Sequence, residues 1–414
     1  MTRPLVLIVQ ALVLAAAPAP LEARPALQET GFARLVERLS EPGGYFDSDN
    51  LVSNETSYLH VLPALRSLGV RGGAYLGVGP EQNFSYLAEV KPEIAILVDI
   101  RRDNMLLHLL FKAMFEVARN RMEYLCLLYG RPVPSILSKW TGQPLDDILT
   151  YLDITAGDPA VHARNHTELM ERVTRLGVAL ADSDRTTLRR FHEEFFERGL
   201  EITFTSRGRP SRPGYPTERQ LYLATDLEGN QGSYLASEES FRVVRDLQRR
   251  DRVVPAVGDL AGPIAIKAIA GYLREINLPV SAFYVSNVEM YLFRAGTFPR
   301  FAENVRELPA GPSSVLIRSY FGRGRWNAGG GGGGGGAAAP FPQPTPGHLS
   351  AQQLQPFPAF LQITARPDAV TYWDVLSNGV VDLRGGGRPE RQRQRRGRKA
   401  AEGQRGRGGE VRAA

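Results

Sequence analysis

Short apolar runs alternate with longer amphipathic segments over most of residues 28–321. Buried strands are predicted at GGAYLGV (72–78), EIAILVDI (93–100), RVVPAV (252–257), LPVSAFYV (278–285) and SSVLIRSYF (313–321). Helices between them are predicted at PEQNFSYLAEV (80–90), residues 103–130 and GPIAIKAIAGYLREI (262–276). Apolar strands that alternate with helices are typical of a parallel sheet with right-handed crossovers. We therefore predict an α/β fold with a doubly wound, mostly parallel sheet.

The stretch between the second and third strands is much longer than a simple crossover. Its first part, residues 103–130, predicts one long helix with Asp103 as N-cap and Gly130 followed by Pro132 as its stop. Residues 131–218 are more polar and predict a helical insertion or cap. The body of the protein would then consist of a first part at 26–130, this insertion, and a second part at 219–325.

Composition changes sharply after the last predicted strand. Residues 326–348 hold a glycine run, three alanines and several prolines, which predicts a linker. Residues 349–383 regain leucines and aromatics, including Trp373, and we expect them to dock on the body as one or two short helices. Residues 384–414 are mostly Arg, Gly and Gln and cannot bury enough apolar surface to order themselves.

The N-terminal 25 residues predict a signal peptide or a retained N-terminal anchor. One basic residue precedes an apolar run at 5–17, and small residues with cleavage positions near Ala19 or Ala23 follow it. The run is short for a membrane span, and no other run predicts a transmembrane bundle. If the signal is cleaved, we expect a periplasmic or extracellular protein, and otherwise a membrane-anchored one, in preference to a cytoplasmic one.

The basic net charge belongs to the C-terminal tail. Residues 384–414 contain eleven Lys and Arg against three Glu, so the +6 of the whole chain leaves −2 for the rest. The tail could contact anionic polymers without specificity, or simply be solvated. A cysteine-based metal site is excluded because Cys126 is the only cysteine. We expect no metal, since His162 and His166 lie four residues apart without a third ligand.

Glycine and polar residues follow four of the predicted strands, at the edge where doubly wound sheets bind ligands. They are Gly77, Gly79, Gln82 and Asn83 after the first strand, Asp99 at the end of the second, Gly258 and Asp259 after the third, and Ser286, Asn287 and Glu289 after the fourth. A glycine turn lets the backbone approach a ligand, and an acid about twenty residues later can bind ribose hydroxyls. These loops predict a small-molecule site of nucleoside type. Alternatively, Gln82 and Asn83 cap the next helix and Asp99 pairs with Arg101 or Arg102.

Further polar residues are candidates for the substrate side of this site. Asn287 could orient a nucleophile, and Glu289 could act as a general base if burial raised its pKa. Asn54 and Glu55 precede the first strand and could close over the pocket, or they could cap a helix with Glu55 solvated. Asp226 lies in a turn between the insertion and the sheet, where it could contact a substrate.

Four longer blocks carry a resemblance to a known family. They are SDNLVSNETSYLHVLP (48–63), YLGVGPEQNFSYLAEVKPEIAILVDIRRDN (75–104), LYLATDLEGNQGSYLAS (221–237) and YVSNVEMYLF (284–293). They look like the blocks of a bacterial family of uncharacterised Rossmann-like proteins related to class I S-adenosylmethionine-dependent methyltransferases. The resemblance covers residues 32–321 and implies a Rossmann-like, class I methyltransferase-like fold.

The resemblance also implies a cofactor and places for it. In class I methyltransferases the glycine turn faces the methionine part of S-adenosylmethionine, and the acid after the second strand binds ribose. The Gly-Asp after the third strand lies along the adenine, and the loop after the fourth faces the transferred methyl group. In this chain those positions are Gly77 and Gly79, then Asp99, then Asp259, and finally residues 286–289.

Two functions of different classes follow. The first is an S-adenosylmethionine-binding, methyltransferase-like protein of unknown substrate. The second is an exported, non-catalytic binding or structural protein on a degenerate methyltransferase-like fold, because an exported protein would be separated from a cofactor made in the cytoplasm. A nicotinamide-dependent dehydrogenase fits less well, since the glycine turn lacks a third glycine.

Overall fold

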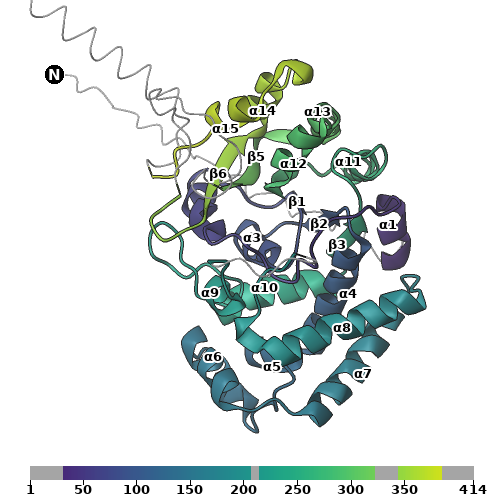
Figure 1. Cartoon of the computed structure of the whole chain (residues 1–414), viewed down its shortest axis with the longest axis vertical. Helices are drawn as coiled ribbons and strands as arrows, with labels where there is room; N and C mark the ends of the chain where they lie inside the picture. Colours follow the sequence, from purple (N-terminus) through teal and green to yellow (C-terminus); the bar gives the residue numbers. More distant parts are fainter. Residues whose placement is uncertain (1–30, 207–213, 322–343, 385–414) are drawn as a thin grey trace, which may run out of the picture.

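The computed structural model describes residues 31–206, 214–321 and 344–384 (Figure 1). The predicted signal or anchor, most of the predicted linker and all but the first residue of the basic tail lie outside these residues. The contact with anionic polymers that was predicted for the tail therefore stays a prediction.

A six-stranded sheet forms the centre of the molecule, in the order β3-β2-β1-β4-β5-β6. Its strands are β1 (Ala74–Gly77), β2 (Ile94–Asp99), β3 (Val253–Val257), β4 (Val280–Ser286), β5 (Ala310–Phe321) and β6 (Ser350–Pro356). The first five are parallel, and β6 runs antiparallel to β5. The predicted α/β fold with a mostly parallel sheet is confirmed. The strand order reverses between β1 and β4, which is the position of a ligand site in doubly wound sheets.

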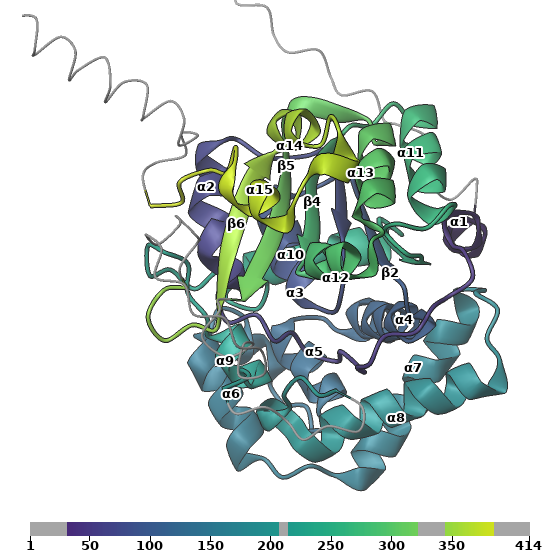
Figure 2. The same cartoon turned by 45° about the horizontal axis from the view of Figure 1, so that its top comes forward.

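Helices cover both faces of the sheet, which explains the continuous apolar runs of its strands (Figure 2). On one face α3 (Gln82–Val90), α4 (Arg102–Val117) and α10 (Glu238–Arg249) pack together. On the other, α1 (Phe32–Leu39), α11 (Ala265–Glu275), α13 (Phe298–Glu307) and α12 (Val288–Ala295) follow one another. The segment at 288–293, predicted as a loop after the fourth strand, is thus part of a helix.

The long helix predicted at 103–130 is divided into two. Helix α4 ends at Val117, Ala118 is extended, and α5 (Arg121–Leu128) begins after Asn120. The side chain of Asn120 accepts a hydrogen bond from the Glu123 N–H at 3.0 Å and so caps the second helix. Asp103 lies in the first turn of α4 and is not its N-cap, which is Arg101. Apolar residues continue across the break, so their pattern does not reveal it.

The stretch predicted as a helical insertion contains three helices of at least ten residues in its described part. They are α6 (Leu145–Ile154), α7 (Pro159–Arg175) and α8 (Asp182–Arg198). Helices α7 and α8 pack on α4, on the side of the molecule away from β6 (Figure 1).

Shorter elements lie before β1 and in or beside the insertion. They are α2 (Leu62–Ser67), α9 (Glu218–Tyr222), and the 3-10 turns η2 (Tyr58–Val61), η3 (Leu137–Trp140) and η4 (Gly199–Glu201).

The C-terminal segment joins the sheet, where only helices were predicted. It adds β6 before α14 (Phe357–Ile363), the turn η5 (Pro367–Ala369) and α15 (Tyr372–Ser377). The sequence SAQQLQP has few apolar residues, yet Gln352, Gln353 and Gln355 are buried because their amide groups form hydrogen bonds. Trp373 packs with its ring centroid 6.1 Å from that of Tyr320 on β5.

Candidate functional site

A cavity of about 370 Å³ lies at the carboxyl ends of β1, β2, β3 and β4. This volume falls within the range of small-molecule sites. Its walls come from the four strand-end loops, the N-terminal segment at 45–55, and α12. Nine of the predicted site residues line it: Asn54, Glu55, Gly79, Gln82, Asp99, Gly258, Asp259, Ser286 and Asn287. Gly77, Asn83, Asp226 and Glu289 are not among its lining residues.

The glycine turn after β1 is filled by a side chain of the protein. Asn83 Nδ2 donates to the carbonyls of Val78 at 2.9 Å and Pro80 at 2.7 Å, and its Oδ1 accepts from the Tyr75 hydroxyl. A Cβ atom on Gly77 would lie 2.0 Å from Asn83 Oδ1, so a larger residue cannot fit there. Asn83 therefore braces the turn, while Gly79 with its φ of 80° faces the cavity. The alternative that Gln82 and Asn83 cap the next helix is wrong, because both lie inside α3, whose N-cap is Glu81 without a side-chain cap.

Asp99 lies where β2 ends, beside this turn. Its Oδ1 accepts the Arg101 N–H at 3.0 Å and lies 3.4 Å from Arg101 Nε, and Gly79 neighbours the carboxylate. Burial raises the pKa of Asp99, and Arg101 and the backbone donors oppose that rise. The side chain keeps 12% of its surface exposed. The predicted pairing with Arg101 and a position on the cavity wall are thus both present.

The carboxylate of Glu41 holds the loop after β3 in place through hydrogen bonds to backbone N–H groups. One of its carboxylate oxygens accepts the Asp259 N–H at 2.8 Å, and the other accepts the N–H groups of Ile264 and Ala265 at the start of α11. The Asp259 carboxylate accepts from Ala261 N–H at 2.9 Å. The N-terminus of α11 therefore already holds a carboxylate of the protein, where a bound phosphate would otherwise find free donors.

Glu55 is held by four hydrogen-bond donors from three strands. Its Oε2 accepts from Tyr284 at 2.8 Å, from Gln352 at 2.8 Å and from Ser319, and its Oε1 accepts from Ser286. Burial raises the pKa of Glu55, and the four donors act in the opposite direction. With only 1% of its surface exposed, Glu55 is not the solvated cap of the alternative prediction.

Glu289 and Asp226 lie elsewhere. Glu289 is buried and its Oε2 lies 2.6 Å from Arg318 Nε, which removes the free carboxylate that a general base in the cavity would need. Asp226 pairs with Arg66 at 2.6 Å and accepts backbone N–H groups of its own turn. Asn287 is the candidate catalytic residue that does face the cavity.

Aromatic residues that sequence reasoning missed line the same cavity. They are Tyr45, Phe46, Phe204 and Tyr291. The rings of Phe46 and Tyr291 meet edge to face with centroids 5.2 Å apart. These residues come from the N-terminal segment, the insertion and α12, so nothing in their sequence spacing joins them.

The lining is acidic as well as aromatic. Glu55, Asp99 and Asp259 supply carboxylates, and no Lys or Arg lines the cavity among the residues that the structure describes. A neutral or positively charged ligand suits such a cavity better than a phosphate.

The chain matches the sequence profile of a family described as a domain of unknown function, DUF7790, over residues 50–131 and 181–371. The protein belongs to this family. The DUF7790 segments include every lining residue of the cavity except Tyr45 and Phe46, and they omit residues 132–180 of the helical insertion. A comparison with curated proteins finds no match.

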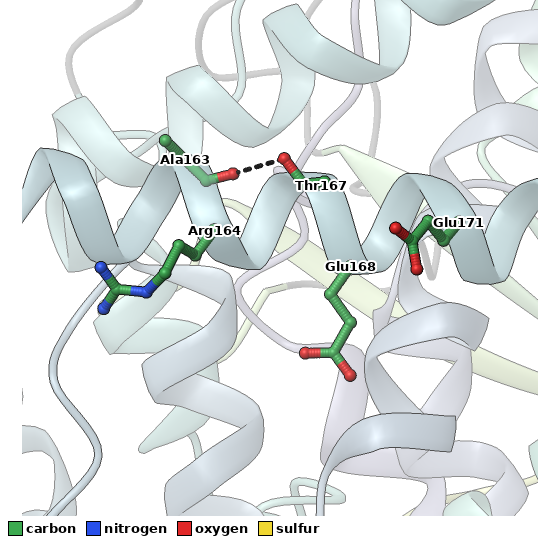
Figure 3. A pocket seen from close by; sticks show the side chains of 5 residues that line it. All are labelled: Ala163, Arg164, Thr167, Glu168 and Glu171. Carbon is green, nitrogen blue, oxygen red and sulfur yellow. Dashed lines mark hydrogen bonds between the residues drawn. The ribbon is translucent and has the colours of Figure 1, made fainter.

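A second hollow lies outside the strand-end loops, on α7 (Figure 3). Its residues are Ala163, Arg164, Thr167, Glu168 and Glu171, which are all exposed. Thr167 Oγ1 donates back to the Ala163 carbonyl at 3.0 Å, and the charged side chains extend separately from the helix (Figure 3). This hollow lacks the buried polar groups of the first cavity.

Three histidines come together between α7 and α8. His162 and His166 meet His192, whose Nδ1 lies 3.3 Å from His166 Nδ1. His166 and His192 are buried. Within the described ranges, no group of three or more His, Cys, Asp or Glu residues has the arrangement of a metal site. The described helices also include none that is both long and apolar enough to cross a membrane.

Proposed function

We propose that the cavity binds S-adenosylmethionine and that the protein is methyltransferase-like, with a substrate still to be identified. The observation that carries this proposal is that the glycine turn and the acid of the next strand line one cavity. Gly79 and Asp99 both line the cavity, which lies at the point where the strand order reverses. That combination is typical of nucleoside sites in doubly wound sheets.

The residues present fit the cofactor in chemistry and in charge. Asp99 is partly exposed and has acceptor capacity for ribose hydroxyls. Val98, Ile100 and Leu260 supply apolar wall for a purine base. The carboxylates of Asp99 and Asp259, in a cavity without Lys or Arg among its described lining residues, suit a positively charged ligand such as this sulfonium compound. When bound, the cofactor would supply an activated methyl group.

The same features argue against a nicotinamide dinucleotide. Its pyrophosphate needs free N–H groups at a glycine turn and helix N-terminus. Here Asn83 fills the turn after β1, and Glu41 occupies the start of α11. Because no Lys or Arg is among the described lining residues, two phosphate groups would be bound in this cavity without a positive charge beside them.

A second candidate is a non-catalytic binding or structural protein, exported if the N-terminal signal is cleaved. The observation that favours it is the use of Asn83 and Glu289 in internal contacts, which leaves Asn287 as the candidate catalytic residue in the cavity. The N-terminal sequence of the mature protein from its native host tests the export part. A start at or after residue 20 supports cleavage, and a start at Met1 contradicts it.

The melting temperature of residues 28–383, with and without S-adenosylhomocysteine, tests cofactor binding. A ligand at 100 times its dissociation constant stabilises a protein by about 2.7 kcal/mol. Adenosine and NAD serve as comparison ligands. We expect a larger shift with S-adenosylhomocysteine than with NAD at equal concentration. A folded sample that shows no shift with millimolar S-adenosylhomocysteine contradicts the proposal.

A further inference from the structure

Buried carboxylates in the described part of the chain are mostly paired with arginine. Eight acidic residues there are buried. Five of them have an arginine partner: Glu123 with Arg119, Asp184 with Arg102, Asp226 with Arg66, Glu238 with Arg121 and Glu289 with Arg318. The other three are Glu55, Glu81 and Glu218. A buried carboxylate without a cation is costly, so each of these three needs an explanation.

Glu81 and Glu218 are neighbours, and this accounts for their burial without an arginine. Their carboxyl groups interact with one another, and the hydroxyls of Tyr234 and Tyr129 donate to Glu81 and Glu218, respectively. Two adjacent carboxyls can share one proton, which removes half of the charge. Glu55 has no acidic neighbour among its hydrogen-bond partners, which are four neutral donors. Neither an arginine nor a shared proton therefore accounts for Glu55.

Because Glu55 lies on the wall of the cavity, a ligand bound there can be the partner that its carboxylate lacks within the protein. Glu55 lines the cavity together with Ser286 and Asn287, on the side formed by the end of β4. Three of its four donors converge on Oε2, while Oε1 accepts only from Ser286. A carboxylate oxygen has two lone pairs, so Oε1 can accept a further hydrogen bond.

Aromatic residues make the same cavity suitable for a cation. Phe46 and Tyr291 line it with their rings edge to face, and Tyr45 and Phe204 line it as well. Aromatic faces attract ammonium groups, and a charge-assisted hydrogen bond to a carboxylate adds direction to that attraction. Carboxylate and aromatic groups in one cavity form a recognition site for an organic ammonium ion.

We propose that Glu55 binds the ammonium group of the substrate, which is a primary or secondary amine that occupies the cavity beside the cofactor. This assignment of a substrate class rests on the proposed function. It places the amine at the Glu55, Ser286 and Asn287 side, and leaves the Asp99 and Asp259 side to the nucleoside. Substrates that present a carboxylate or a phosphate to this side are disfavoured by the same charge.

Three probes of one shape and different charge test the proposal: benzylamine, benzyl alcohol and benzoate. Each is titrated by ligand-observed NMR into the full-length protein, with and without saturating S-adenosylhomocysteine. We expect benzylamine to bind tighter than either other probe by about tenfold or more, the size of one charge-assisted hydrogen bond. We also expect it to bind in the presence of S-adenosylhomocysteine.

Two variants separate Glu55 from the general charge of the protein. Glu55→Gln keeps the shape of the side chain and removes its charge, and we expect benzylamine to bind it about tenfold more weakly or worse. Glu239→Gln removes one negative charge from an exposed residue on α10 and should bind benzylamine like the wild type. If Glu55→Gln does not fold, the probe series on the wild-type protein decides.

Two results would overturn this inference, and a third would separate it from the proposed function. Benzylamine that binds no tighter than benzyl alcohol overturns it. Benzylamine that is displaced by S-adenosylhomocysteine also overturns it, because Glu55 would then hold the ammonium group of the cofactor itself. Selective binding of benzylamine without any binding of S-adenosylhomocysteine would support the amine site and contradict the proposed function, so the two failures are distinguishable.

Discussion

Arg318 of β5 and Glu289 of α12 form a buried ion pair, with 2.6 Å between Arg318 Nε and Glu289 Oε2 and at most 2% of either side chain exposed. Arg318 also donates to Gln355 on β6 at 2.8 Å. The pair thus ties the helix after β4 to the last two strands of the sheet. Glu289 has the burial that was expected of a general base, but its carboxylate contacts an arginine instead of the cavity.

We expect Glu289→Ala to lower the free energy of unfolding by about 3–5 kcal/mol, because it leaves the charge of Arg318 buried without an acidic partner. The double variant Glu289→Leu with Arg318→Leu should be more stable than the single variant, since it leaves no unpaired charge. Urea denaturation followed by circular dichroism measures both. A Glu289→Ala protein as stable as the wild type would show that the carboxylate is not needed for packing and reopen a role in the cavity.

Asp99 is expected to contribute directly to nucleoside binding. Asp99→Asn replaces one acceptor oxygen by a donor, so a charge-assisted hydrogen bond to ribose would be lost, at a cost of about tenfold or more in affinity. Calorimetric titration with S-adenosylhomocysteine measures this change. Asp246→Asn, which removes an acid with 56% of its side chain exposed on α10, is the matched control. Equal affinities of the two variants for S-adenosylhomocysteine would show that Asp99 pairs with Arg101 and does not contact the ligand.

The sheet could be predicted because its central strands are buried on both faces. Such strands read as unbroken apolar runs, and the carboxyl ends of parallel strands meet at one edge. This geometry is why nine of the predicted residues line one cavity. β6 was missed because its buried positions are glutamines, whose burial depends on partners far along the chain, such as Glu55 for Gln352.

Pairings across the sheet could not be predicted either. Glu289 contacts Arg318 because β4 and β5 pair in one particular register. The positions of the two residues in the sequence do not reveal that register. The aromatic lining has the same origin, since Phe46, Phe204 and Tyr291 come from three separate segments. Strand ends are a local property of the sequence, whereas contacts between loops and across strands depend on the assembled fold.

The Glu81–Glu218 pair should make the protein less stable as the pH rises. Burial raises the pKa of both carboxyls, so the folded state holds a proton that the unfolded chain releases. Their favourable contribution is fully present below the glutamate pKa of the unfolded chain, about 4.3, and is lost as the pH rises toward the folded pKa values. Glu218→Gln keeps a hydrogen-bond donor for Glu81 and removes one titrating group.

We therefore expect the melting temperature of Glu218→Gln to fall less than that of the wild type between about pH 5 and about pH 8. Glu201→Gln, at a position with 70% of its side chain exposed, is the control and should follow the wild-type curve. Parallel curves for Glu218→Gln and the wild type would mean that the pair does not take up a proton on folding.

His192 makes the helical insertion sensitive to acid. It is fully buried, its Nε2 lies 3.0 Å from the Leu127 carbonyl, and its Nδ1 lies 3.3 Å from His166 Nδ1. Burial, with a further effect of His162, lowers the pKa of His192 to about 3. Because the folded pKa is below the unfolded value of about 6.5, the unfolded chain takes up a proton first as the pH falls, and stability is lost.

At about pH 5 this loss amounts to about 2 kcal/mol for a single histidine with these two pKa values. We expect the urea midpoint of the wild type to fall between about pH 7.5 and about pH 5, and that of His192→Gln to fall less, whatever its stability at neutral pH. His348→Gln, at a half-buried histidine outside the cluster, is the control. An equal fall in His192→Gln and the wild type would mean that His192 is already protonated in the folded protein or that other groups dominate its acid response.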